Sequence, residues 1–405
     1  MTGSWGQRGT RALILGGLLL WLLLLLLTGA ARLIGPLLPD AGALTVLLSL
    51  DSSAVHLLDG RGGPPVRVLR PYLGDLLLAA WSPDGSRLLA QLLNGSQFAL
   101  LVHETGSGVT YQITTLPACA TGISFGYAPV WSPDGTQVVF SAQLEGDNCD
   151  LFLWDALHGD TRRLTSLPGN STSPTWSPDG TRLAFVSSQD GNQALYTLDV
   201  ASGTAEPLAD LWSLGPAWSP DGNRIALTAS LAAQNVIVVV DAATGVWQNL
   251  SASQDGQAVH AQWSPDGTWL VYDLYRPGRG TDLYLADLTS GDVINISPPG
   301  DADGEEKGPL WSPDGRWLVY ESWDGGTRTM ILVDVANESL QPLFSDWTRA
   351  SGNGGYDWQG TRLTYGFTEV DGTCSIYIYD AATGETRHLT TQPDPLYMMG
   401  WWPQP

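Results

Sequence analysis

The pentapeptide WSPDG occupies residues 81–85, and identical copies begin at residues 131, 176, 218, 263 and 311. The copies lie 42 to 50 residues apart, which indicates a protein built from one recurring supersecondary unit. Ser and Asp favour tight turns, Pro presets φ and Gly accepts a positive φ, so the motif predicts a turn between two strands. The Trp before the turn is large enough to fill the space between neighbouring units. We therefore expect a structural role for this motif.

When the repeats are aligned with one another, three features recur with this period, and each occurs eight times. One is an apolar strand directly after the turn, such as RLAFVS at 182–187, with an early copy, TVLLSL, at 45–50. Another is a strand that ends in Asp before a Gly-containing turn, such as LYTLDVASG at 195–203. The remaining feature comprises the anchors Trp81, Trp131, Trp176, Trp218, Trp263, Trp311, Trp358 and Trp401, of which the last two stand in degenerate copies.

A short strand follows each Gly-containing turn, so each unit is expected to hold four strands. Four-stranded units of about 45 residues are typical of β-propeller blades. The sequence therefore predicts an all-β fold, a β-propeller of eight blades, or of seven if the terminal copies do not pair. A last strand around Trp401 would complete the blade that residues 45–50 begin, which would close the ring and remove free sheet edges.

The motif, the apolar strand after it and a later D-x-x-[TS]-G turn followed by R-x-L-T resemble the PD40 repeat of TolB-type, WD40-like propellers. The resemblance covers residues 41–402 and implies one propeller domain over residues 41–405. Residues 358–362 depart from it, because two turn residues are missing there. The matching residues are scaffold, so the resemblance implies a fold and leaves the function open.

The N-terminus has a different composition. Residues 12–31 are 20 residues without a charge, long enough to span the roughly 30 Å hydrocarbon core as a helix. The positive-inside rule then predicts that residues 1–11 are cytoplasmic, and residues 32–40 form a short linker. Cleavage of a signal peptide before Arg32 is the alternative. The propeller is thus expected outside the cytoplasm, either as a single-pass membrane protein or as a secreted or periplasmic protein.

The charge balance restricts the partners. The sequence has 41 acidic and 19 basic residues and a formal net charge of −22. Such a surface repels phosphate backbones, so we expect no nucleic-acid binding. An envelope protein or a glycan is the expected partner, besides the membrane contact of the N-terminal helix, and the chain is expected to be a monomer.

Candidate sites with reactive or metal-binding chemistry are few. GISFG at 122–126 has the spacing of a nucleophile elbow, but no helical pattern follows it. DADGEE at 301–306 begins like a calcium loop without completing it, so we expect no cofactor, with an irregular Ca²⁺ site as the alternative. His260 precedes an inner strand and could line the mouth of the ring. The candidate calcium ligands are Asp301, Asp303 and Glu305.

The cysteines suggest one disulfide. Cys119 and Cys149 precede two strands of the same unit, in loops that share one face. In an oxidising compartment these two could form a bridge, which leaves Cys374 as the odd thiol.

Aromatic residues in the outward-facing loops, mixed with acidic ones, form the best candidate recognition surface. We expect a non-catalytic scaffold that binds a protein or a glycan. The alternative is a propeller enzyme, a polysaccharide lyase or hydrolase, with its site in the outward-facing funnel. The candidate binding residues are Phe125, Tyr127, Trp212, Tyr275, Trp323, Trp347 and Tyr356.

Overall fold

A computed structural model describes the chain in a series of ranges that contain β-strands and turns. The fold prediction is therefore confirmed at the level of an all-β protein built largely from four-stranded antiparallel sheets. The described ranges are residues 44–49, 54–59, 66–69, 75–94, 97–117, 128–143, 148–189, 192–251, 255–298, 304–324, 327–344, 356–368, 373–392 and 396–401.

The strands fall into consecutive groups, each called a unit below and named by its strands. The chain opens with β1 (Leu44–Ser49), β2 (Ala54–Asp59) and β3 (Val66–Leu69) and closes with β32 (Leu396–Trp401). Between them lie β4 (Asp75–Trp81), β5 (Arg87–Asn94), β6 (Gln97–Glu104) and β7 (Thr110–Pro117); β8 (Val130–Trp131), β9 (Gln137–Gln143), β10 (Cys149–Asp155) and β11 (Thr161–Arg163); β12 (Asn170–Trp176), β13 (Arg182–Gln189), β14 (Asn192–Asp199) and β15 (Ala205–Ala209); β16 (Ser213–Trp218), β17 (Arg224–Leu231), β18 (Gln234–Asp241) and β19 (Trp247–Asn249); β20 (Gln257–Trp263), β21 (Trp269–Arg276), β22 (Gly280–Asp287) and β23 (Val293–Asn295); β24 (Glu305–Trp311), β25 (Trp317–Asp324), β26 (Thr327–Asp334) and β27 (Ser339–Phe344); and β28 (Tyr356–Gln359), β29 (Arg362–Thr368), β30 (Cys374–Asp380) and β31 (Glu385–Gln392).

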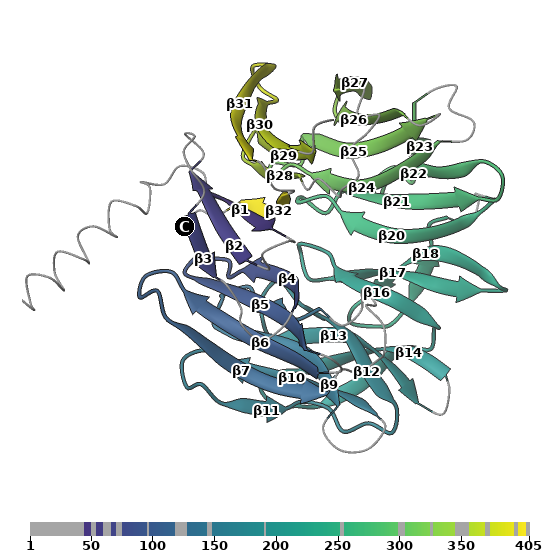
Figure 1. Ribbon diagram of the computed structural model, residues 1–405. Helices are drawn as coiled ribbons and strands as arrows, with labels where there is room; N and C mark the ends of the chain where they lie inside the picture. Colours follow the sequence, from purple (N-terminus) through teal and green to yellow (C-terminus); the bar gives the residue numbers. More distant parts are fainter. Residues whose placement is uncertain are drawn as a thin grey trace, which may run out of the picture.

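Within a unit, each strand pairs antiparallel with the next along the chain. Units β20–β23 and β24–β27 are joined into one sheet by a single parallel bridge between Thr281 and Glu305. The units follow one another in sequence order around a ring, from purple to yellow in Figure 1. The first strands of neighbouring units contact one another, as β12, β16 and β20 do, so these strands form the inner side of the ring.

The two ends of the ring meet in one sheet, whose strand order is β3-β2-β1-β32. Thr45 pairs with Trp401 and Leu47 with Met398, with a bulge between Val46 and Leu47. Figure 1 shows the purple β1 beside the yellow β32. This antiparallel pairing joins the first and last strands of the propeller and covers an edge that would otherwise be exposed.

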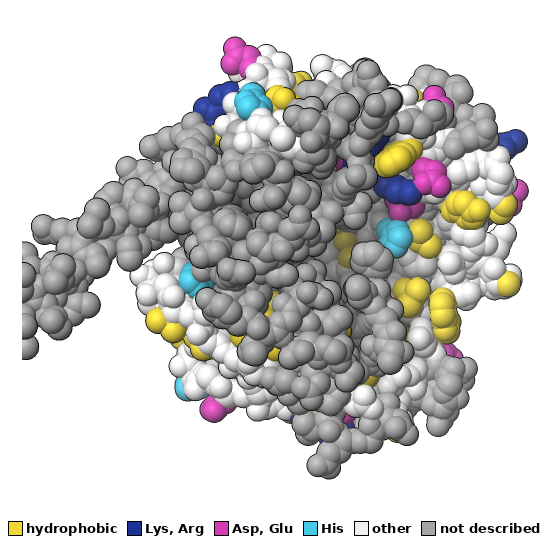
Figure 2. Space-filling model, viewed as in Figure 1, with side chains coloured by type: hydrophobic (Ala, Val, Ile, Leu, Met, Phe, Trp, Pro, Cys, Tyr) yellow, Lys and Arg dark blue, Asp and Glu magenta, His cyan; other side chains and the backbone are white. Residues whose placement is uncertain are grey.

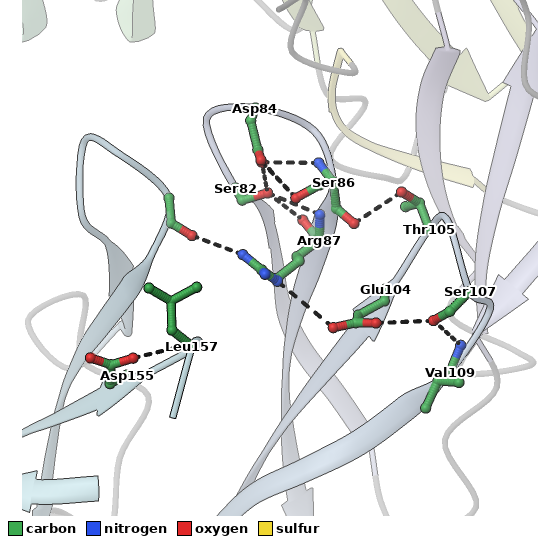
Figure 3. A network of polar contacts seen from close by, with 11 residues as sticks. Ser82, Asp84, Ser86, Arg87, Glu104, Thr105, Ser107, Val109, Asp155 and Leu157 are labelled. Carbon is green, nitrogen blue, oxygen red and sulfur yellow. Dashed lines mark hydrogen bonds and ion pairs between the residues drawn. The ribbon is translucent and has the colours of Figure 1, made fainter. Parts of the chain in front are cut away.

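The WSPDG turns satisfy their own polar groups. The Ser264 hydroxyl donates to an Asp266 carboxylate oxygen at 2.6 Å and accepts from the Trp269 N–H at 2.9 Å. The same carboxylate accepts from the Thr268 N–H at 3.0 Å, and Gly267 adopts a φ of 72°. Figure 3 shows the corresponding bonds of Ser82 in the copy at residues 81–85. The pentapeptide is therefore a turn whose shape is set by its own side chains.

The Trp and the Arg that flank this turn connect neighbouring units. The Trp263 indole N–H donates to the Ala217 carbonyl at 3.0 Å, and that carbonyl belongs to the residue just before the anchor Trp of the preceding unit. The Arg224 guanidinium stacks over the Trp263 ring at 4.9 Å and donates to the Gly267 carbonyl at 3.0 Å. Equivalent indole bonds are made by Trp131, Trp176, Trp218 and Trp358.

The hydrophobic core also lies between units. In one cluster, Leu151 and Leu153 of β10 pack with Leu183, Phe185 and Leu198 of the next unit. Each sheet thus buries its apolar faces against its neighbours, so the units stabilise one another around the ring.

Candidate functional site

A β-bulge interrupts the inner strand of four consecutive units. In β12, β16, β20 and β24 the register shifts shortly before the anchor Trp. The residue three positions before that Trp adopts a positive φ in each: Ser173 55°, Gly215 59°, His260 57° and Gly308 63°. This conformation is unstrained for Gly and costs about 1 kcal/mol or more for a residue with a Cβ. Ser173 and His260 therefore hold a conformation that favours Gly, and His260 is the one of the two with a titratable side chain.

His260 is held by a carboxylate of the neighbouring strand. Its Nδ1 lies 2.8 Å from Asp273 Oδ2, and its side chain is 72% exposed whereas that of Asp273 is 13% exposed. The hydrogen bond to Asp273 raises the pKa of His260, and partial burial opposes this. Among the described residues, the buried Oδ1 of Asp273 has no hydrogen-bond partner. The pair therefore presents an imidazole, favoured in its charged form, toward the solvent.

The next unit holds a buried ion pair, whose carboxylate Glu321 occupies the position equivalent to Asp273. Glu321 of β25 pairs across the strands with Lys307 of β24. Arg328 donates to Glu321 from Nε at 3.0 Å and also from Nη2, and both side chains are buried. Burial raises the pKa of Glu321, and the charges of Arg328 and Lys307 act against this. Lys307 itself is exposed, with Nζ 2.5 Å from Glu305 Oε2.

Comparison of the repeating units singles out Asp273 and Glu321. Asp273 and Glu321 are each the tenth residue after their anchor Trp. The other four WSPDG units carry neutral residues there. An acidic side chain at this position thus distinguishes two adjacent units from their sister units. The neutral residues are Gln91, Ser141, Val186 and Thr228.

Tyr356 links a third unit to this cluster. It begins β28, and its hydroxyl donates to the Gly308 carbonyl and lies 3.4 Å from the Lys307 carbonyl oxygen. A Cβ at residue 308 would lie 2.5 Å from that hydroxyl, so Gly308 permits the close approach as well as the positive φ. Burial raises the pKa of Tyr356, and the carboxylates of Glu321 and Asp273 raise it further. These groups therefore share one electrostatic neighbourhood.

Exposed aromatic side chains flank the cluster. Tyr275 and Trp323, 46% and 41% exposed, are each the twelfth residue after their anchor Trp, two residues beyond Asp273 and Glu321 and on the same strand face. Trp212 is 44% exposed, and its carbonyl accepts from Ser230, the twelfth residue after its own anchor. We call Trp212, Tyr275 and Trp323 the aromatic rim. Figure 2 shows apolar, basic, acidic and His side chains gathered on one side of the face, over the region of β20 and β24 in Figure 1.

Part of the predicted site lies among the described residues. Trp212, Tyr275 and Trp323 are exposed and belong to three consecutive units, whereas the Tyr356 hydroxyl is engaged by backbone carbonyls. Glu305 pairs with Lys307. The other candidates, Phe125, Tyr127, Trp347, Asp301 and Asp303, lie outside the described residues.

The remaining predictions are tested only in part. Cys149 is buried and disulfide-bonded, while its expected partner Cys119 lies outside the described residues. The apolar segment 12–31 also lies outside them, and the portion of the chain that is described contains no helix suited to crossing a membrane. In the same portion, no three His, Cys, Asp or Glu residues are grouped to hold a metal ion.

Sequence reasoning pointed to His260 and to the aromatic rim but missed Asp273, Lys307, Glu321 and Arg328. Two signals could have found them. One is the acidic residue at the tenth position of two units, and the other is that Lys307 is the only lysine of the sequence.

Comparisons with known proteins support the fold. Residues 123–211 match the family model of the PD40 TolB beta propeller domain. A puromycin-hydrolyzing peptidase from Mycobacterium tuberculosis is similar in structure, with 17% identity, a TM-score of 0.55, and coverage of 79% of this chain and 54% of the peptidase. An oligogalacturonate lyase from Vibrio parahaemolyticus is also similar, with 12% identity, a TM-score of 0.51, and coverage of 78% and 86%.

TolB from Acinetobacter baumannii aligns with 18% identity and a TM-score of 0.40, over 82% of each chain. No curated protein matches the sequence. The structural likenesses concern the fold alone, because folds of this kind carry unrelated functions. The resemblance seen in the sequence is confirmed for residues 123–211, which match the PD40 TolB beta propeller domain.

Proposed function

We propose that this protein is a non-catalytic, extracytoplasmic β-propeller of eight blades that binds a glycan at the aromatic rim. The observation that supports the proposal most directly is the rim itself, three exposed aromatic side chains from three consecutive units. Aromatic rings offer flat apolar faces to the C–H faces of sugars, and the polar groups between them offer donors and acceptors to hydroxyl groups.

The charges of the site favour a glycan over a cationic peptide. A cationic partner needs accessible carboxylates, but Asp273 is mostly buried behind His260, and Glu321 is buried against Arg328. The accessible carboxylate of Glu305 is already paired with Lys307. The carboxylates of Asp273, Glu305 and Glu321 are therefore already engaged by basic side chains of the chain itself.

The architecture supports a tethered scaffold. Residues 44–49 pair with the C-terminal strand, so the segment before them leads into the ring at its closure. In the proposal, residues 12–31 anchor the chain in the membrane and the rim faces away from it. Retention of the N-terminal segment in purified protein, measured by intact mass, tests the anchor, because signal cleavage before Arg32 would remove it.

A propeller lyase or hydrolase is the second candidate. His260 favours it, because the residue holds a strained φ and is oriented by Asp273, as a general base would be. In the described part of the chain, however, the titratable side chains of the site are hydrogen-bonded in pairs. No third titratable side chain joins a pair to form a catalytic set there. Release of new saccharide ends from a bound glycan would establish the enzyme and overturn the scaffold.

The binding test uses the full chain in detergent micelles on an array of neutral and charged oligosaccharides. Trp323→Ala and Trp212→Ala are expected to weaken binding of the selected glycan about tenfold each, because each removes a stacking surface. Trp247→Ala is the matched control, since Trp247 is 42% exposed on the outer strand β19. Absence of glycan binding, or equal losses for Trp247→Ala, would contradict the proposal.

A further inference from the structure

We propose that the site is selective for acidic glycans, with an anionic group of the sugar held between His260 and Lys307. This inference rests on the proposed glycan-binding function. Carboxylate and sulfate groups share the required chemistry, which is a compact negative charge with several acceptor oxygens.

Lys307 is unusual in the chain as a whole. It is the only lysine among 405 residues and stands on the exposed side of the inner strand β24. Its side chain is 58% exposed, and its backbone carbonyl lies 3.4 Å from the Tyr356 hydroxyl, which helps to fix the strand locally. The exposed ammonium group of Lys307 thus extends from a backbone that the Tyr356 hydroxyl contacts.

His260 supplies the second cation from the equivalent stretch of the neighbouring inner strand. Its Nδ1 is engaged by Asp273, and its Nε2 makes no hydrogen bond with any of the described residues. Two sister units place Gly215 and Gly308 at the same bulge, where Gly is unstrained, and a third places the small Ser173 there. A His at this position costs stability, and a functional role of the imidazole would explain why the residue is present.

The carboxylates near these cations are arranged so that they do not repel an anion strongly. Asp273 is only 13% exposed, and the buried Glu321 is neutralised by Arg328. Glu305 is the exposed competitor, since it pairs with Lys307. The rest of the acidic surface is screened beyond roughly 8 Å at physiological ionic strength. His260, Lys307 and Arg328 are thus each paired with a carboxylate, and an anion that binds Lys307 would displace Glu305 from it.

Tyr356 connects the two cations within one site. Its hydroxyl contacts the backbone of Lys307 and Gly308, and its pKa is raised in part by Asp273, the partner of His260. Strand β21, which carries Asp273, also contacts β24, which carries Lys307, so the His260–Asp273 pair and Lys307 belong to strands that lie side by side. An anion between them would also lie beside Trp323 and Tyr275 of the aromatic rim.

The experiment compares an oligosaccharide of hexuronic acid, its carboxyl-reduced counterpart and a sulfated neutral oligosaccharide, by calorimetry with the full chain in micelles. We expect the acidic sugars to bind at least about tenfold more tightly than the reduced one. The two acidic arms show whether carboxylate or sulfate is preferred.

Variants test which side chain binds the anionic group of the sugar. Lys307→Gln is expected to abolish most of the difference in affinity between the acidic and the reduced sugars, and Lys307→Arg is expected to retain that difference. Glu305→Gln should strengthen binding of the acidic sugars, because it removes the competing carboxylate. Arg316→Gln is the control, because Arg316 is a similarly exposed cation, 54%, at the WSPDG end of the same unit.

A second readout uses the single lysine. An amine-reactive reagent can modify Lys307 and the N-terminus, and the acidic sugar is expected to protect only Lys307, as measured by peptide mass spectrometry. Equal affinity for the acidic and reduced sugars would overturn this inference and leave the glycan proposal intact. Binding of no glycan would overturn both, and preferential binding of an acidic peptide would indicate a protein partner instead.

Discussion

The two ends of the inner strands differ in how strictly they repeat. At the WSPDG end, the Ser hydroxyl bonds to the turn Asp in each of the six copies, and the Trp indole bonds to the preceding unit in most units, as Trp263 does. At the opposite end, the same backbone bulge carries Ser173, Gly215, His260 and Gly308 in successive units. The repeating end joins the blades, whereas the varying end presents different chemistry from a fixed frame. In a repeat protein, a departure from the repeat is therefore the better guide to a site.

The largest expected effect tests the repeating end. Trp263→Ala removes a buried indole, its hydrogen bond to Ala217 and its stacking with Arg224, so it should destabilise the protein by about 3–5 kcal/mol. Equilibrium denaturation in urea measures this change. The exposed Trp247→Ala should stay within about 0.5 kcal/mol of the wild type. Similar losses in the two variants would show that the indole does not join the blades.

An intermediate effect is expected at the varying end. Arg328→Met leaves Glu321 buried without its partner and should cost about 3 kcal/mol, limited by protonation of Glu321, whose pKa burial already raises. The double variant Arg328→Met with Glu321→Gln should regain stability relative to the single one. A double variant less stable than Arg328→Met would indicate that the pair is not the source of the loss.

The smallest effect concerns pH and His260. Because Asp273 raises the pKa of His260, the native state holds the proton more tightly than the unfolded chain. The resulting stabilisation is present in full below the unfolded value of 6.5 and is lost as the pH rises through the raised folded pKa. The imidazole is largely exposed, so the effect should stay below about 1 kcal/mol.

His260→Asn is the matched variant, because Asn tolerates a positive φ and does not titrate. Unfolding free energies of the two proteins at pH 5.5 and pH 8 isolate the contribution of His260 from other groups such as the buried His103. If the variant keeps the whole pH difference of the wild type, the His260–Asp273 pair does not cause it.

The repeating unit, its strands and their order could be predicted from the amino-acid sequence. The strand expected at residues 182–187 is observed as Arg182–Gln189, and the one expected at 45–50 as Leu44–Ser49. Such assignments succeed because turn residues and alternating apolar residues act locally, within a few positions of one another.

Which polar residues meet depends on how the units pack and on the register of their strands. Tyr356 reaches the carbonyl of Lys307, 49 residues earlier, because the ring places their units side by side. The bulge that puts His260 at a positive φ depends on pairing with β21, and the pairing of Glu321 with Arg328 depends on the register of β25 with β26. These contacts join residues distant in sequence or set by strand register, so local patterns carry no record of them. They exist only once the units have closed around a common axis.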